Sequence, residues 1–64
     1  MNLIDELLEE IDRNKEILKY YEALPQGVFG ASFIKKDIEF ARNAIVDQNT
    51  ASMAQALKTL RETN

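Results

Sequence analysis

Apolar side chains recur every three or four residues along most of this sequence, and no segment shows the strict alternation of a half-buried β-strand. This period places apolar side chains on one face of an α-helix, so it predicts helices at about residues 3–23, 31–46 and 50–61, with the start of the second as early as residue 28. The apolar faces of the second and third helices are Ile34, Ile38, Ala41 and Ile45, and Met53, Ala56, Leu57 and Leu60. A glycine-containing loop at residues 24–30 separates the first two helices. The chain is therefore predicted to be all-α, with residues 1–64 forming one domain, a small three-helix bundle.

The chain has 64 residues and contains neither cysteine nor histidine, which limits how it can stabilise a core. A domain of this length buries only about 60% of the surface that its unfolded chain exposes. Disulfides are excluded, and carboxylates alone would make a poor structural zinc site. Association with further copies remains as a source of buried surface, so we expect a homo-oligomer that completes the bundle.

The apolar face of the first helix is the expected oligomer interface. Its members are Ile4, Leu7, Leu8, Ile11, Asn14 and Leu18. Asn14 occupies a position where the heptad pattern requires an apolar residue. It is either a buried amide that fixes the register of paired helices or a side chain at the edge of the face that reaches water. We expect the second, because a single interruption of the pattern is weak support for a buried amide.

Charge and residue types exclude several classes of function. The formal net charge is −3 and the pI is about 4.8, whereas general nucleic-acid binding requires a clustered basic surface. No apolar run approaches the roughly 18 residues of a membrane span, and the acidic N-terminal region does not resemble a signal peptide, so we expect a cytoplasmic protein with no membrane partner. Without histidine or cysteine the common catalytic triads cannot form, and the carboxylates show no metal-ligand spacing. We therefore predict no enzyme activity, metal or cofactor.

The loop before the second helix has the composition of an anion-binding site. Two glycines, a hydroxyl and two ammonium groups surround a helix N-terminus, where backbone N–H groups lack partners and the helix dipole is positive. Aromatic side chains at the end of the first helix and in the loop are suited to stacking on a nucleotide base. The candidate ligand-binding residues are Tyr20, Tyr21, Gly27, Phe29, Gly30, Ser32, Lys35 and Lys36.

The same loop also has a purely structural interpretation. Gly27 can serve a turn by adopting a positive φ, and Gly30 can allow the first two helices to cross closely. A pair of adjacent lysines is often a solvated surface, and the loop lacks the full Walker spacing. The sequence favours the structural interpretation slightly and leaves both open.

The loop residues and the helices after them resemble a group of small helical proteins of phages and prophages. The resemblance consists of a G-x-F-G-A-x-x-I-K loop, here Gly27–Lys35, followed by an A-x-x-A-I helix and an M-x-x-A-L helix, here 41–45 and 53–57. It implies a phage-type accessory protein located in the host cytoplasm. In size and helicity the chain is also similar in kind to phage anti-defence proteins that sequester cyclic nucleotide signals between their subunits.

Two hypotheses of function follow. In the first, the chain is an oligomeric, non-enzymatic protein that binds or sequesters a small anionic or nucleotide ligand at the Gly27–Gly30 loop. In the second, it is a protein–protein adaptor or inhibitor that presents a helical face to a host protein. The acidic first half of the first helix would suit a basic partner, such as the binding groove of a nucleic-acid enzyme.

Overall fold

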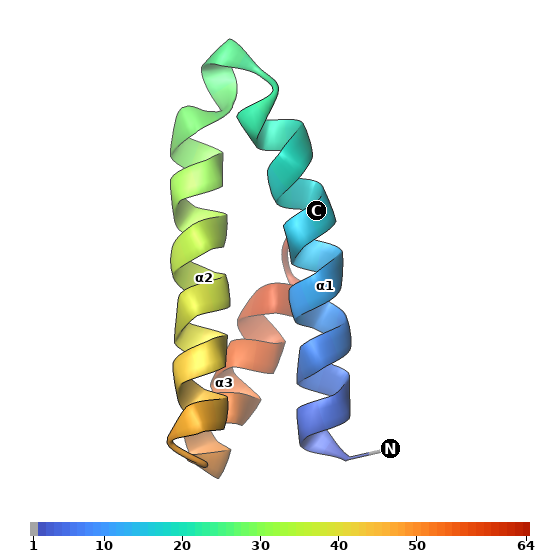
Figure 1. Ribbon diagram of the computed structural model, residues 1–64, viewed down its shortest axis with the longest axis vertical. Coiled ribbons are helices and arrows are strands. Elements are labelled where there is room, and N and C mark those ends of the chain that lie inside the picture. Colours follow the sequence, from blue (N-terminus) through green and yellow to red (C-terminus); the bar gives the residue numbers. More distant parts are fainter. Residues whose placement is uncertain (1) are drawn as a thin grey trace.

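The computed structural model describes residues 2–64, and its regular structure in this range consists of helices alone. The elements are α1 (Leu3–Glu22), a 3₁₀ turn η1 (Pro25–Gly27), α2 (Val28–Val46) and α3 (Thr50–Arg61). α1 and α2 run side by side in opposite directions, and α3 crosses behind them (Figure 1). Each helix contacts both others, which confirms the predicted all-α three-helix fold. Residue 1 of the expected domain lies outside the described range.

Two asparagines start α1 and α3. The side-chain Oδ1 of Asn2 accepts a hydrogen bond of 2.8 Å from the backbone N–H of Asp5. The Oδ1 of Asn49 accepts one of 3.0 Å from the N–H of Ser52. Both satisfy N–H groups that have no partner within the first turn of a helix. Asn2 and Asp5 are three residues apart, the spacing that this type of cap requires.

The connection between α1 and α2 is shorter than the predicted loop of residues 24–30. Leu24 is extended, as expected before proline, and Pro25 begins the 3₁₀ turn. Gly27 has a φ of −88° and a ψ of 1°, so α2 starts directly afterwards at Val28, the early end of the range 28–31 expected for its start. Gly30 therefore lies in the first turn of a helix. The expected positive φ at Gly27 is wrong, and no glycine of residues 2–64 has one.

α2 ends in a Schellman motif at Gln48. The N–H of Gln48 donates to the carbonyl of Ile45, and the N–H of Asn49 donates to the carbonyl of Ala44. Gln48 has a φ of 52°, the left-handed conformation that glycine usually occupies at this position. This reversal turns the chain sharply and lets α3 pack against α2 after a very short connection.

The core is aliphatic and lies where the three helices meet. Its fully or nearly buried members are Leu7, Ile11, Ile34, Ile38, Ala41, Ala44, Met53, Ala56, Leu57 and Leu60. Leu7 and Ile11 were predicted to contact a second subunit, but α2 and α3 of the same chain already cover them. Of the predicted interface, only Ile4 and Leu8 are exposed, at 40% and 47%, while Leu18 is partly buried against the core.

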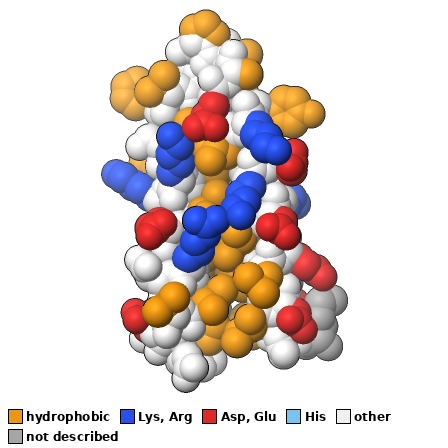
Figure 2. Space-filling model, viewed as in Figure 1, with side chains coloured by type: hydrophobic (Ala, Val, Ile, Leu, Met, Phe, Trp, Pro, Cys, Tyr) orange, Lys and Arg blue, Asp and Glu red, His pale blue; other side chains and the backbone are white. Residues whose placement is uncertain are grey.

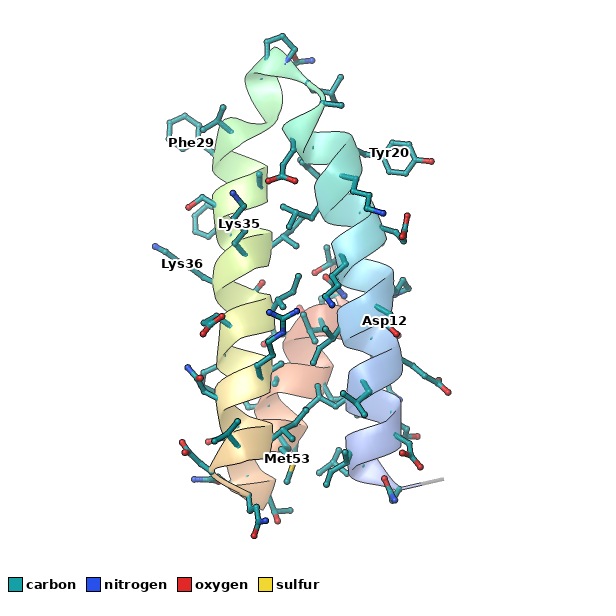
Figure 3. The ribbon with its side chains drawn as sticks, viewed as in Figure 1. Asp12, Tyr20, Phe29, Lys35, Lys36 and Met53 are labelled. Atoms are coloured by element: carbon teal, nitrogen blue, oxygen red, sulfur yellow. The ribbon has the colours of Figure 1, made fainter. Side chains whose placement is uncertain are left out.

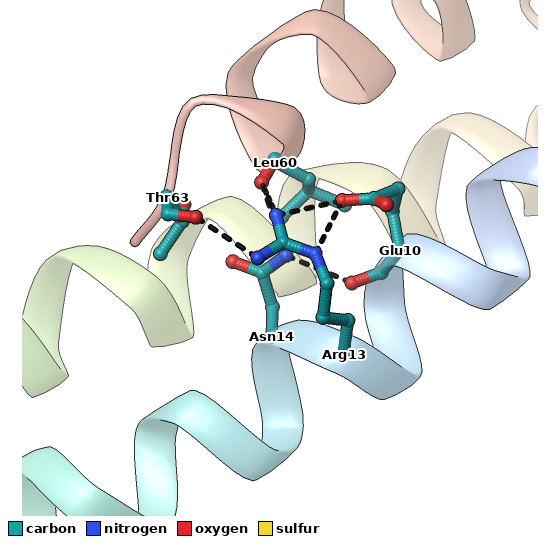
Figure 4. A network of polar contacts seen from close by, with 5 residues as sticks. All are labelled: Glu10, Arg13, Asn14, Leu60 and Thr63. Atoms are coloured by element: carbon teal, nitrogen blue, oxygen red, sulfur yellow. Dashed lines mark hydrogen bonds and ion pairs between the residues drawn. The ribbon is translucent and has the colours of Figure 1, made fainter.

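Asn14 is fully buried, so the expectation that it reaches water is wrong. Its Nδ2 donates to the carbonyl of Glu10 at 2.8 Å and to the carbonyl of Leu60 at 3.2 Å (Figure 4). Arg13 donates to the carbonyls of Leu60 and Thr63 at 2.7 and 3.0 Å, and its guanidinium pairs with Glu10 at 2.8 Å. The last carbonyls of a helix lack partners within the helix. α1 therefore caps the C-terminal end of α3, and Asn14 belongs to the fold of a single chain.

Candidate functional site

Tyr21 links the two glycines of the predicted ligand loop. A Cβ atom added to Gly27 would lie 2.0 Å from the backbone oxygen of Tyr21, and one added to Gly30 would lie 2.6 Å from the Tyr21 ring. Gly27 is buried, and its N–H donates to the carbonyl of Leu24 at 2.9 Å. The N–H group of Gly27 therefore already has a hydrogen-bond partner within the chain. The close approach of α1 and α2 explains both glycines, and neither needs a ligand to account for it.

An open groove lies between the end of α1 and the start of α2. Its volume is about 500 Å³, within the usual range for small-molecule sites. Four of the predicted ligand-binding residues line it: Tyr21, Ser32, Lys35 and Lys36. Glu22, Leu24, Val28 and Ala31 complete its lining. The Nζ of Lys35 lies 3.1 Å from a carboxylate oxygen of Glu22, and both side chains are about half exposed.

A second groove of about 340 Å³ adjoins the first and shares Lys35 with it. Leu18 and Ile38 give it an apolar lining, and Lys15, Arg42 and Glu39 complete it. Figure 2 shows basic side chains gathered over the seam between α1 and α2, with hydrophobic side chains along the same seam. The two grooves together form a basic band, defined here by Lys15, Lys35, Lys36 and Arg42.

The structure does not bring the remaining aromatic candidates into this groove. The side chains of Tyr20 and Phe29 are 76% and 80% exposed. They project away from the bundle on opposite sides, Tyr20 from α1 and Phe29 from α2 (Figure 3). Neither can stack on a ligand held beside Lys35 without a change of conformation. Tyr21 is the one aromatic residue of the predicted set that lines the groove.

Sequence reasoning missed two members of the basic band, Lys15 and Arg42. The helical period contained a signal for both. Lys15 and Leu18 are three residues apart on α1, and Lys35 and Arg42 are seven apart on α2, so each pair shares a helix face. What the sequence did not indicate is that these two faces adjoin, because that depends on how α1 packs against α2.

Three further properties of residues 2–64 bear on the predictions: the pKa values of titratable groups, clusters that could bind a metal, and helices that could cross a membrane. Partial burial raises the pKa of Asp37 above its ordinary value of 3.8. Within residues 2–64, no cluster of three or more side chains could hold a metal ion. In the same range, none of the helices combines the length and the apolar character needed to cross a membrane.

Comparisons of this chain with protein-family models, with curated proteins and with solved structures gave no match.

Proposed function

We propose that the chain is a non-enzymatic protein that binds a small anionic ligand, such as a nucleotide, in the grooves between α1 and α2. The observation that carries this proposal is the distribution of charge. The sequence has eight lysines and arginines against eleven acidic residues, yet four of those eight cations line two adjoining grooves. Clustered cations beside an apolar lining are the chemistry that a phosphate-bearing organic ligand requires.

The contacts of Lys35 fit this role. It lines both grooves, and its only ion pair within residues 2–64 is with Glu22. An ion pair between two half-exposed side chains contributes little stability. A phosphate group can therefore replace the Glu22 carboxylate at small cost, while Arg42 offers a planar guanidinium suited to two parallel hydrogen bonds. Sequestration as the biological role follows from the likeness in size and helicity to phage anti-defence proteins that sequester cyclic nucleotides.

Calorimetric titration tests this proposal with three probes: a cyclic dinucleotide, a nucleoside triphosphate and inorganic pyrophosphate. Lys35→Ala combined with Arg42→Ala is expected to weaken binding at least about tenfold, as loss of charge-assisted hydrogen bonds does. Lys58→Ala, on the exposed surface of α3, is the matched control and should leave the affinity unchanged. Stronger binding of the nucleotides than of pyrophosphate would indicate a contact to the base. Absence of binding by all three probes, or equal effects of both variants, would overturn the proposal.

A second candidate function, a protein–protein adaptor or inhibitor, is supported by the outer face of α1. Four exposed carboxylates follow one another there at helical spacing: Asp5, Glu9, Asp12 and Glu16. An acidic line of this kind suits a basic partner surface. Neutralising Asp5, Glu9 and Asp12 to the corresponding amides should abolish capture of such a partner from a bacterial host lysate, whereas Lys35→Ala should not. Failure of the wild-type chain to retain any basic protein reproducibly would contradict this candidate.

A further inference from the structure

All three phenylalanines of the chain lie on one exposed face of α2. Phe29, Phe33 and Phe40 are separated by four and seven residues, the spacing that aligns side chains along a helix. They are 80%, 64% and 46% exposed. Figure 3 shows Phe29 projecting outward from α2, on the side where Lys36 also projects. Phenylalanine is among the residue types most often buried, so three of them exposed along one helix face mark a candidate contact surface.

We propose that a second copy of the chain covers the phenylalanine face, with α2 of each copy packed antiparallel against α2 of the other across a two-fold axis. The inference rests on the exposed phenylalanines and not on the anion site, although Lys36 borders both surfaces. The oligomer expected from the sequence would then form through α2 instead of α1, whose Leu7 and Ile11 are already buried within the chain.

The exposed aromatic area is of the size that such a contact needs. A buried aromatic side chain covers 150–250 Å², so the three exposed fractions correspond to roughly 400 Å² per copy. A standard interface buries about 800 Å² per partner, of which the aromatic residues would supply half and their neighbours on α2 the rest. A 64-residue chain with a small aliphatic core also gains more from a second copy than a larger domain does.

One flank of the phenylalanine face carries both a cation and a carboxylate, so this flank can pair with the same flank of a second copy. Lys36 and Glu39 are three residues apart on the flank of the phenylalanine face that is nearer the grooves, and each also borders one groove. Neither forms an ion pair among residues 2–64. A two-fold antiparallel contact brings this flank against the same flank of the second copy. Lys36 of each copy can then pair with Glu39 of the other, at the register where Phe33 meets Phe40.

The other flank gives a further check on the register. Asp37 lies one position beyond Lys36, about 100° around the helix and so on the opposite side of the face. In the proposed arrangement it lies across from its counterpart, where two carboxylates repel. Asp37→Asn is therefore expected to tighten the dimer severalfold, because it removes the repulsion and leaves the aromatic contact in place.

Sedimentation equilibrium of the full chain, from micromolar to submillimolar concentration, tests the proposal. The wild-type chain should reach twice the 7.3 kDa mass of one copy. Phe33→Ser combined with Phe40→Ser should weaken the dimer at least about 100-fold, since each substitution acts twice at a symmetric interface. Tyr20→Ser, which removes a still more exposed aromatic side chain from α1, should leave the dimer unchanged. Circular dichroism of each variant confirms that the helices persist.

A charge exchange separates this interface from a non-specific aromatic contact. Lys36→Glu alone should weaken the dimer, and Lys36→Glu combined with Glu39→Lys should restore it. A chain that stays monomeric at the highest concentration would overturn the proposal and leave the phenylalanine face to a different protein. Dimers that are insensitive to the Phe33 and Phe40 substitutions, or that Tyr20→Ser weakens equally, would overturn it as well.

Discussion

The side-chain Nδ2 of Asn14 lies 3.2 Å from the backbone carbonyl oxygen of Leu60 and donates a hydrogen bond to it, in a position with no exposed surface. This contact joins the middle of α1 to the last turn of α3. Arg13 donates to the same carbonyl from the solvent side, at 2.7 Å. The short third helix is thus held by hydrogen bonds to its C-terminal end as well as by its apolar face.

Asn14→Ala is expected to lower the free energy of unfolding by about 2 kcal/mol, because it removes a buried hydrogen bond and leaves a small cavity. The Oδ1 atom of Asn14 has no hydrogen-bond partner, which keeps the loss below that of a fully paired amide. Urea denaturation followed by circular dichroism measures the change. Asn43→Ala, at an exposed position of α2, should alter stability by less than about 0.5 kcal/mol. Equal effects of the two substitutions would mean that Asn14 contributes no buried contact.

Gln48→Gly is expected to stabilise the chain by about 1 kcal/mol, since a residue with a side chain is strained in the left-handed conformation at a helix end. The matched control is Gln55→Gly in the middle of α3, where glycine should cost about the same amount. Thermal unfolding of both variants shows whether each substitution stabilises or destabilises the chain. A loss of stability at Gln48 would show that its side chain makes a contact worth more than the backbone strain.

The helices could be predicted from local pattern, and the two asparagine caps likewise involve only residues close in sequence. The three-to-four-residue period and the Asn2–Asp5 spacing depend only on residues close in sequence. The burial of Asn14 could not be predicted in this way, because it depends on α3, where the carbonyl of Leu60 that accepts from Asn14 is 46 residues away in sequence. A heptad pattern shows that a position faces inward, but the neighbour that it meets is decided by tertiary packing.

The candidate site was predictable to a similar extent. Ser32, Lys35 and Lys36 follow the loop on one helical segment, and the structure places them in one groove with Tyr21. The glycines were ambiguous, since a glycine that admits a ligand and one that admits a neighbouring ring have the same sequence signature. Only the position of the Tyr21 ring against Gly30 distinguishes the two roles.

Asp37→Asn is expected to raise the stability of the monomer at neutral pH, because partial burial raises the pKa of Asp37 above 3.8. The folded chain then binds the proton more tightly than the unfolded chain, so this group stabilises the fold below pH 3.8 and loses that contribution as the pH rises through the folded pKa. The gain at pH 7 should stay below about 0.5 kcal/mol, since water still screens the carboxylate. Urea titrations at protein concentrations where sedimentation shows monomer, with Asp12→Asn as control, measure it. A difference that persists unchanged at pH 3 would contradict the titration of Asp37 as its cause.

Gly27→Ala is expected to destabilise the chain by at least about 2 kcal/mol, because the added Cβ would meet the backbone oxygen of Tyr21 at 2.0 Å. Backbone cannot rotate out of the way as a side chain can, so the turn between α1 and α2 must open. Thermal unfolding monitored by circular dichroism reports the loss. A melting temperature equal to that of the wild-type chain would show that the turn tolerates a wider separation of the two helices.

Gly30→Ala separates helix propensity from contact with Tyr21. Alanine is favoured over glycine in the body of a helix by about 1 kcal/mol, but here the added Cβ would lie 2.6 Å from the Tyr21 ring. The ring belongs to a side chain and can move, so Gly30→Ala should cost less than Gly27→Ala while still destabilising the wild-type chain. In a Tyr21→Ala background the obstacle is gone, and Gly30→Ala should become stabilising by about the helix-propensity difference. Urea denaturation of the four chains of this double-mutant cycle measures the change of sign. Additive effects of the two substitutions would show that the Tyr21 ring does not determine the glycine at position 30.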